Sequence, residues 1–215
     1  MSCRPPPPSL DPLYDTWPAG RVIHVIHDTA FAPERFNPGV DAHGKLRRPT
    51  RFAPVFDRLE QVVPYLYGGS TFACAIYETI FHDVPFIGKD KFVDLDDFAQ
   101  RGYGQLIPRR DLKLVDLTSK GLRRLDAPKE ELITSPSADY EGTALWAQAL
   151  HHAFHDVDGL LWMSRQYDRD QSLLLFGDRV SGALSGARMG LRLAEDNDLR
   201  QAIISAALEA GIVVN

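Results

Sequence analysis

One glutamate stands alone in an apolar stretch. In the segment YGGSTFACAIYETIFHDVP, the hydroxyl of Ser70 or Thr71 can cap a helix that runs to about Phe81. The helix is apolar nearly all round, which indicates an element buried on every side. Burying an unpaired carboxylate is costly, so Glu78 lies near an exposed end of the helix, pairs with a cation, or is retained for chemistry.

Two histidines have a spacing that could bind a metal ion. His151 and His155 would lie one turn apart on a helix, which suits zinc. No glutamate stands beside the first histidine as it does in metalloproteases, and no distant third ligand is suggested. His24 and His27 fall on opposite faces of a strand and cannot chelate one ion together. We therefore expect no metal.

Common nucleotide-binding and acyl-transfer motifs are missing. Tyr67-Gly68-Gly69-Ser70 lacks the lysine of a P-loop, and Ser181–Gly190 does not follow the strand-to-helix context of a dinucleotide fingerprint. No Gly-x-Ser-x-Gly elbow of a serine hydrolase occurs. A local basic cluster, which we expect to be mostly solvated loop, consists of Lys45, Arg47, Arg48, Arg51 and Arg58.

Several short motifs, each weak alone, resemble one family when taken together. In chain order they are Arg51-Phe52 in TRFAP, Tyr67 eleven residues before Glu78, and Asp158 through Arg165 in DGLLWMSR, which contains Ser164. Weaker matches are Pro18-Ala19-Gly20 and a pattern from Tyr140 to His151. From about residue 18 to 180 the chain resembles the RES domain toxins of bacterial toxin–antitoxin pairs, named for an Arg, a Glu and a Ser.

The resemblance implies a reaction on NAD⁺, with NAD⁺ as the substrate. The nicotinamide–ribose bond would be cleaved by hydrolysis or phosphorolysis, or ADP-ribose would be transferred to a protein. Departure of neutral nicotinamide leaves an oxocarbenium-like ribose, the charge problem that glycosidases solve with carboxylates. Glu78 would supply the stabilising negative charge, and its apolar helix provides a setting of low dielectric constant.

The resemblance also implies roles for the other motif residues. Arg51, with Glu78 and Tyr67 in the catalytic set, would fork onto the pyrophosphate with paired donors. Tyr67 would offer a ring face to nicotinamide or ribose. Ser164 would hydrogen-bond the nicotinamide amide or the ribose, and Phe52 and Arg165 belong to the binding set.

One position departs from the family pattern. The first-strand arginine of the family falls between the residues that match His24 and His27, and that position is Val25 here. Arg21 stands four residues earlier and projects from the same face of a strand about 13 Å away, at roughly 3.3 Å per residue. Either Arg21, included in the binding set, takes over the role, or the arginine is lost or replaced by another basic residue. We favour loss or replacement.

The sequence therefore predicts an NAD⁺-degrading toxin, a glycohydrolase or phosphorylase, neutralised by a cognate Xre-like helix-turn-helix antitoxin. One alternative is a mono-ADP-ribosyltransferase acting on a protein target. Another, motivated by Val25, is a catalytically impaired relative that binds NAD or a protein partner. We expect no direct nucleic-acid or membrane partner, and a homodimer stays open.

Strands and helices alternate irregularly, which predicts an α+β fold: a compact mixed sheet with flanking helices, resembling ADP-ribosyltransferase folds. Residues 29–64 read as mostly loop with a helical turn around 55–63, and Gly68-Gly69 as a turn. Strands are expected at 21–28, 65–67, 112–117, 160–163 and 173–176, and helices at 70–81, 140–155 and 196–210, the last stopped by Gly211.

Composition limits the remaining choices. The chain has 215 residues and a net charge of −5, which argues against a protein that binds the nucleic-acid backbone. Two cysteines are too few for a disulfide framework, and no apolar run is long enough to span a membrane, so a cytoplasmic location is expected. Six of the 15 prolines lie in residues 1–18, which predicts an extended arm before a single domain over residues 19–215 with a C-terminal helix.

Overall fold

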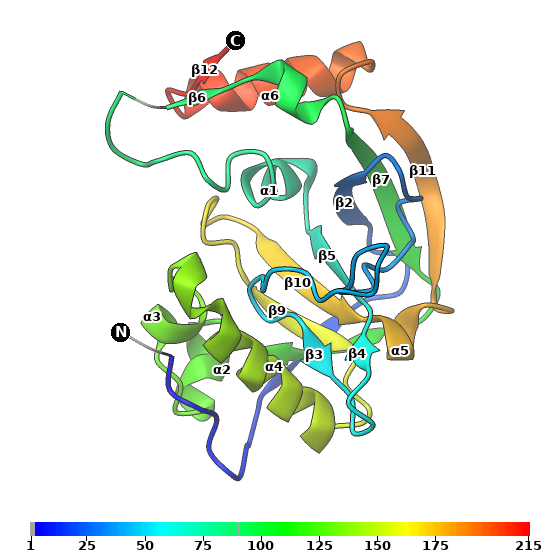
Figure 1. Ribbon diagram of the computed structural model, residues 1–215, viewed down its shortest axis with the longest axis vertical. Coiled ribbons are helices and arrows are strands. Elements are labelled where there is room, and N and C mark those ends of the chain that lie inside the picture. The colour runs from blue at the N-terminus through cyan, green and yellow to red at the C-terminus, as the bar shows by residue number, and fades with distance from the viewer. Residues whose placement is uncertain (1–2, 90) are drawn as a thin grey trace.

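An eight-stranded mixed sheet runs through the molecule, which is described by a computed structural model over residues 3–89 and 91–215 (Figure 1). The strand order is β1-β8-β9-β10-β5-β2-β7-β11, and only the β8–β9 pair is parallel. In that order the strands span Tyr14–Trp17, Leu112–Asp116, Gly159–Met163, Gln171–Phe176, Tyr65–Gly69, Ile23–Asp28, Arg101–Pro108 and Leu184–Arg192. The mixed sheet with flanking helices confirms the predicted α+β class.

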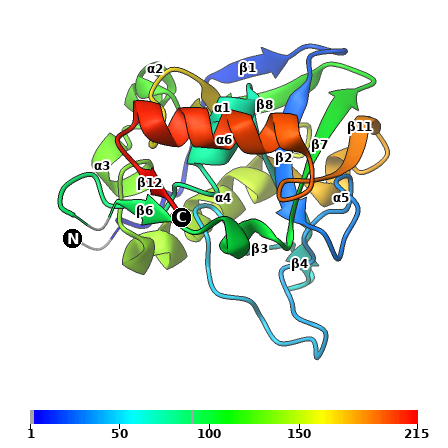
Figure 2. The same ribbon diagram turned by 90° about the horizontal axis from the view of Figure 1, so that it is seen from above.

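The helices lie in two groups (Figures 1 and 2). The first group gathers α2, α3 and α4 beside the β8–β9–β10 part of the sheet, and the second has α6 above α1 near β2 and β7. The helices are α1 Phe72–Tyr77, α2 Ser119–Arg124, α3 Lys129–Leu132, α4 Tyr140–Ala153, α5 Gly177–Val180 and α6 Asn197–Glu209, with 3-10 turns η1 Leu95–Phe98 and η2 Ser137–Asp139. Two small sheets pair β3 Val55–Phe56 with β4 Val62–Val63 and β6 Phe92–Val93 with β12 Val213–Val214.

The sheet curls on itself, as its buried side chains show. Trp17 and Leu112 come from one end of the strand order, and Leu106 and Leu184 come from the other end, yet all four belong to one core cluster. A second cluster joins α2–α4 to β9 and β10, and a third joins α1 and α6 around Tyr103. Because the sheet curls, α1 faces the group of helices that contains α4 (Figure 1). The cavity described below lies between α1 and that group.

The predicted strands at 21–28, 112–117, 160–163 and 173–176 and the long helices are confirmed within a few residues. The C-terminal helix shows why its boundaries could be predicted. Its cap, Asp196, accepts a hydrogen bond from Leu199 N at 3.0 Å, and Gly211 ends it at a φ of +68°. Its buried positions, Leu199, Ile203 and Ala207, repeat every fourth residue.

Two expectations in the first half of the chain are wrong. Residues 55–63 form the β3–β4 hairpin and not a helical turn, because Asp57 Oδ1 accepts bonds from Leu59 N and Gln61 N and closes a tight turn. The residues expected to end the proline-rich arm form β1, which pairs with β8 and buries Trp17 completely. The folded part of the chain therefore begins before Ala19.

The segment around the isolated glutamate also differs from expectation. Gly68 and Gly69 are not a turn but the last two residues of β5. A Cβ on Gly68 would lie 2.3 Å from Ile23 Cγ2, so close packing of β5 on β2 explains this glycine. Helix α1 ends at Tyr77, with turns continuing toward Phe81, and Glu78 is its C-terminal cap.

Packing predicts a strong effect at the Asp-Gly pair before β9. A Cβ on Gly159 would lie 2.1 Å from Leu174 O, a backbone atom of the neighbouring strand. We expect Gly159→Ala to lower the free energy of unfolding by roughly 1–3 kcal/mol, measured by urea denaturation. Gly182→Ala is the matched control, because nothing lies within 4 Å of its Cβ. Equal midpoints for the two variants would contradict the packing argument.

Candidate active site

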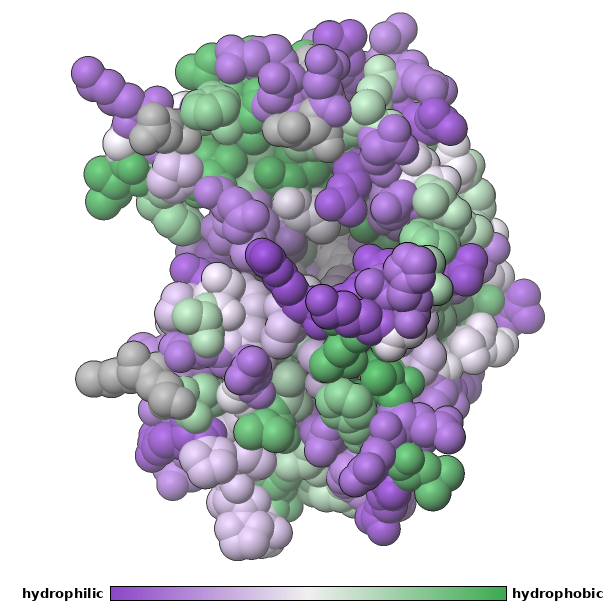
Figure 3. Space-filling view, viewed as in Figure 1, coloured by the Kyte–Doolittle hydropathy of each residue, from purple (hydrophilic) through white to green (hydrophobic). Residues whose placement is uncertain are grey.

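A cavity of about 550 Å³ opens between the two helix groups. Figure 3 shows a hollow near the middle of this face with hydrophilic residues along its rim. Its walls come from β2, β5, α1 and the loop between β2 and β3, with single residues from β7, β9, β10 and α4. Of the predicted site residues, Glu78, Tyr67 and Arg51 line it, whereas Ser164, Phe52, Arg165 and Arg21 do not.

Glu78 is held by a serine from a distant strand end. Its Oε1 accepts a 2.6 Å hydrogen bond from Ser164 Oγ and a longer one, 3.4 Å, from Gln166 N. Ser164 is fully buried, and its Oγ also accepts from Tyr167 N. Glu78 lies at the end of the helix, and the partner of its carboxylate is a hydroxyl and not a cation.

Both ends of α1 are tied to the same loop. Thr71, the N-terminal cap, donates from Oγ1 to Asp170 Oδ2 at 2.6 Å, while Glu78 receives Ser164 at the other end. The loop closes on itself because Ser164 N donates to Asp170 O and Asp168 N donates to Ser164 O. The β9–β10 connection therefore fixes the position and direction of the Glu78 carboxylate.

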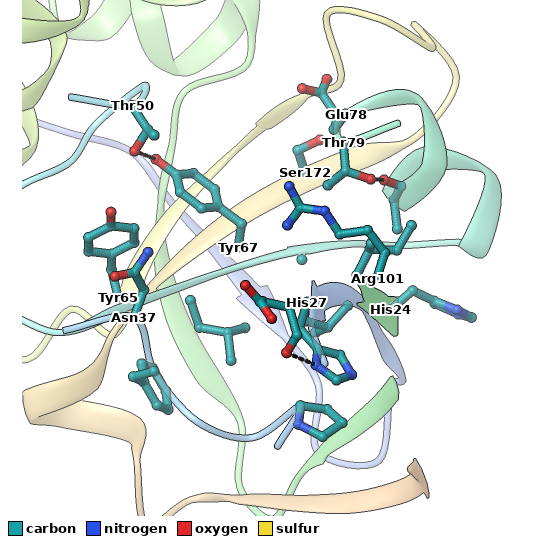
Figure 4. A pocket seen from close by; sticks show the side chains of 18 of the residues that line it. His24, His27, Asn37, Thr50, Tyr65, Tyr67, Glu78, Thr79, Arg101 and Ser172 are labelled. Atoms are coloured by element: carbon teal, nitrogen blue, oxygen red, sulfur yellow. Dashed lines mark hydrogen bonds between the residues drawn. The ribbon is translucent and has the colours of Figure 1, made fainter. Parts of the chain in front are cut away.

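Tyr67 stands on β5 with its hydroxyl buried. The hydroxyl donates to Arg51 O and lies 3.0 Å from Thr50 Oγ1. Its ring packs edge-on against Tyr65 and Trp162, with centroid distances of 5.7 and 6.4 Å. Burial raises the pKa of Tyr67 far above its usual value, so the side chain stays neutral and serves as a wall of the cavity, as Figure 4 shows.

Arg51 uses its guanidinium to fasten one wall of the cavity. Nη1 donates to Leu132 O at 2.9 Å and Ser135 Oγ at 3.1 Å, and Nη2 donates to Ser135 O and Tyr140 Oη, both at 3.2 Å. Arg165 Nη1 shares Ser135 O at 3.0 Å. Burial lowers the pKa of Arg51, but an arginine stays protonated in proteins. Forking onto a pyrophosphate would require these bonds to break.

Phe52 points away from the cavity because of the turn it occupies. Thr50 and Ala53 exchange backbone hydrogen bonds, so Arg51 and Phe52 are the two central residues of a tight turn and their side chains diverge. Phe52 has a φ of 69°, donates its N–H to Thr143 Oγ1, and packs its ring 5.2 Å from that of Trp162. It belongs to the core behind the cavity.

Arg21 does not reach the cavity. Its guanidinium lies 3.7 Å above the Trp17 ring, and Nη2 donates to Gln171 Oε1 at 2.9 Å. At the position where the family pattern has an arginine, Val25 is 4% exposed and forms an apolar part of the cavity wall. Arg21 therefore does not take over from Val25.

Residues 21–193 match the RES domain family. The chain belongs to the RES domain family. No curated protein matches the sequence significantly. Among solved structures, a chain of the M. tuberculosis MbcT–MbcA toxin–antitoxin complex is similar, with a TM-score of 0.54 and 12% sequence identity over 81% of this chain and 85% of that chain. At that identity the likeness shows a shared fold.

In this RES domain the arginine, glutamate and serine motifs come together in three dimensions, although only two of the three line the cavity. Ser164 lies behind Glu78, and Arg51 lines the cavity beside Tyr67. Trp162, Arg101 and His24 also line the cavity, although their sequence patterns did not indicate them as site residues. Trp162 lies inside the recognised DGLLWMSR motif, which could have indicated it, but nothing near Arg101 in the sequence does.

His151 is held by another side chain of the same chain and not by a metal-binding arrangement. His151 Nε2 lies 2.9 Å from Asp178 Oδ2, and α4 ends before His155, so the two histidines do not share a helix face. Within the described ranges, no three His, Cys, Asp or Glu side chains gather as metal ligands. Over the same residues, no helix is long and apolar enough to cross a bilayer.

His24 makes a polar contact within the third core cluster. Its Nδ1 lies 2.7 Å from Tyr103 Oη, which also accepts a hydrogen bond from Gln105 Nε2. The single hydroxyl proton of Tyr103 can be donated to an unprotonated Nδ1. Burial lowers the pKa of His24 and raises that of Tyr103. Both groups are therefore uncharged in the folded protein at neutral pH.

This pair predicts an acid-sensitive stability. Because folding lowers the His24 pKa, the unfolded chain takes up the proton first, and stability is lost as pH falls below about 6.5. We expect the melting temperature of the wild type to fall more steeply between pH 7.5 and 5 than that of His24→Asn, whose amide can keep the bond to Tyr103. Parallel curves for the two proteins would show that His24 does not contribute.

Proposed function

We propose that this RES domain protein cleaves the nicotinamide–ribose bond of NAD⁺, as a glycohydrolase or phosphorylase. The observation that supports this most is the Glu78 carboxylate, held by Ser164 at the wall of an aromatic- and arginine-lined cavity. A volume of about 550 Å³ falls within the usual range of ligand pockets, roughly 300–1,000 Å³.

The chemistry follows from the position of the carboxylate. When the bond between C1′ and the nicotinamide nitrogen breaks, its electron pair leaves with nicotinamide, and positive charge develops on the ribose. Glu78 has Oε1 engaged by Ser164, which leaves Oε2 to face that charge or to orient a ribose hydroxyl. A water or phosphate oxygen then bonds to C1′ and releases its proton to a base or to solvent.

The cavity also suits a flat aromatic leaving group. Tyr67 and Trp162 present aromatic surface, and Val25 adds an apolar patch. Burial keeps Tyr67 neutral, so it neither competes with Glu78 for the cationic ribose nor repels the anionic substrate. Ser164 acts in this proposal as a positioning residue, because its hydroxyl is committed to Glu78 and not exposed to the cavity.

We further propose that the protein acts as a toxin in the cytoplasm, with a cognate antitoxin of the Xre-like helix-turn-helix class. The similar solved structure is a chain from a toxin–antitoxin complex, which supports an antitoxin partner without indicating its class. Transfer of ADP-ribose to a protein is the competing reaction. Covalent retention of labelled ADP-ribose on a target would distinguish transfer from hydrolysis or phosphorolysis.

Glu78→Gln tests the reaction directly. Purified protein incubated with NAD⁺, with and without phosphate, should release nicotinamide, and Glu78→Gln should lower the rate by roughly a hundred- to a thousandfold because the stabilising charge is removed. Glu141→Gln is a matched control at an exposed carboxylate on α4. Absence of release from the wild type, or equal release from Glu78→Gln, would contradict the proposal.

Ser164→Ala tests the positioning role. Loss of a buried hydroxyl that serves Glu78 and Tyr167 should cost roughly 1–3 kcal/mol of stability. We expect kcat for nicotinamide release to fall while KM for NAD⁺ changes little, because the carboxylate loses its orientation and the cavity keeps its shape. Ser181→Ala, at an exposed position, is the control. A change in KM alone would assign Ser164 to substrate binding.

A further inference from the structure

The cavity contains four arginines, and their availability differs. Arg51 is fully engaged by carbonyl and hydroxyl oxygens. Arg47 donates through Nε to Val40 O, and the Arg35 guanidinium lies 4.7 Å from the Phe31 ring, both within the loop between β2 and β3. The fourth, Arg101, is exposed, and its guanidinium makes no hydrogen bond or ion pair with the residues that the structure describes.

Arg101 starts from a rigid part of the backbone. It is the first residue of β7, which is paired on one side with β2 and on the other with β11. Arg101 stands opposite Asp28, and the next residue, Gly102, stands opposite His27. A Cβ on Gly102 would lie 2.8 Å from His27 Nε2, so the His27 ring occupies the space beside this glycine.

Arg101 also stands where two cavities meet. A second cavity of about 450 Å³ lies next to the first, and Arg101, Thr79 and Asp83 line both. Thr79 follows Glu78 directly, so the shared wall adjoins the proposed catalytic carboxylate. Figure 4 draws Arg101 between β2 and the end of α1 that carries Glu78 and Thr79.

Carboxylates around the cavity make a cation such as Arg101 important for binding an anionic ligand. Glu78, Asp28 and Asp83 all line it, and an anionic ligand entering past three carboxylates needs a cation to offset their repulsion. Asp83 lies 2.7 Å from His82 Nδ1, and neither it nor Asp28 forms an ion pair with Arg101 in the described structure. The guanidinium fork is free for a ligand.

We propose that Arg101 binds a phosphate group of a ligand in the cavity. The proposal rests on the proposed function and names the group that holds its anionic substrate. A guanidinium binds phosphate through two parallel N–H donors, which a lysine cannot reproduce. The phosphate is either the pyrophosphate of NAD⁺ or an inorganic phosphate that attacks C1′.

Two variants and two probes test this assignment. Calorimetry with ADP-ribose and with inorganic phosphate should give a Kd for the wild type that rises roughly ten- to a hundredfold in Arg101→Ala and less in Arg101→Lys. Arg123→Ala, an exposed arginine on α2 outside both cavities, should bind as the wild type does. Because the Arg101 guanidinium makes no hydrogen bond or ion pair with the described residues, its variants should melt at the wild-type temperature.

Kinetics identify the phosphate. A raised KM for NAD⁺ in phosphate-free buffer assigns Arg101 to the pyrophosphate, and loss of phosphate stimulation assigns it to the inorganic acceptor. Equal affinities of Arg101→Ala and wild type for both probes, or no binding of either probe to the wild type, overturns the assignment. A wild type that binds ADP-ribose through Arg101 but releases no nicotinamide contradicts the proposed reaction and leaves the phosphate site standing.

Discussion

The hydrogen bond from Ser164 to Glu78 fixes the carboxylate on which the proposed reaction depends. A carboxylate at the C-terminal end of a helix meets the negative end of the backbone dipole, so this position is unfavourable unless donors compensate. Ser164 Oγ and Gln166 N supply them. The loop that carries both also receives Thr71 from the start of α1. One loop thus holds the short helix α1 at both ends. The buried hydroxyl of Ser164 fixes the direction of the Glu78 carboxylate.

The arginines in and behind the cavity differ in how far other residues engage their guanidiniums. Arg51 and Arg165 meet at Ser135 O and bind the α3–α4 connection to the turn that carries Phe52. Their guanidiniums satisfy backbone carbonyls that would otherwise be buried without donors, which is a structural role with a large penalty for removal. Arg101 has no such duty. An arginine of the family motif, Arg51, can therefore hold the cavity wall in place. In our proposal the contact with the ligand comes from Arg101, which belongs to no motif.

Sequence patterns predicted the elements whose signals are local. The apolar runs of β9 and β10 and the capped helix α6 are examples. The β3–β4 hairpin was missed because helical apolar spacing competed with the turn chemistry of Asp57. Strand β1 was missed because prolines surround it, although an edge strand tolerates them. Glu78, Tyr67 and Arg51 were found through their motifs, but Arg101 depends on the pairing of β7 with β2, which no local pattern reveals.

The pairing of β5 with β10 has a consequence for synthesis of the protein. Tyr67 and Glu78 emerge from the ribosome early, but the strand that flanks β5 ends at Phe176 and the serine that orients Glu78 is 86 positions later in the chain. Contacts so distant in sequence form slowly and only after the intervening chain is made. A nascent chain that carries the glutamate thus has no ordered carboxylate until translation is nearly complete. Truncated products should be inert, whatever the reaction of the finished protein.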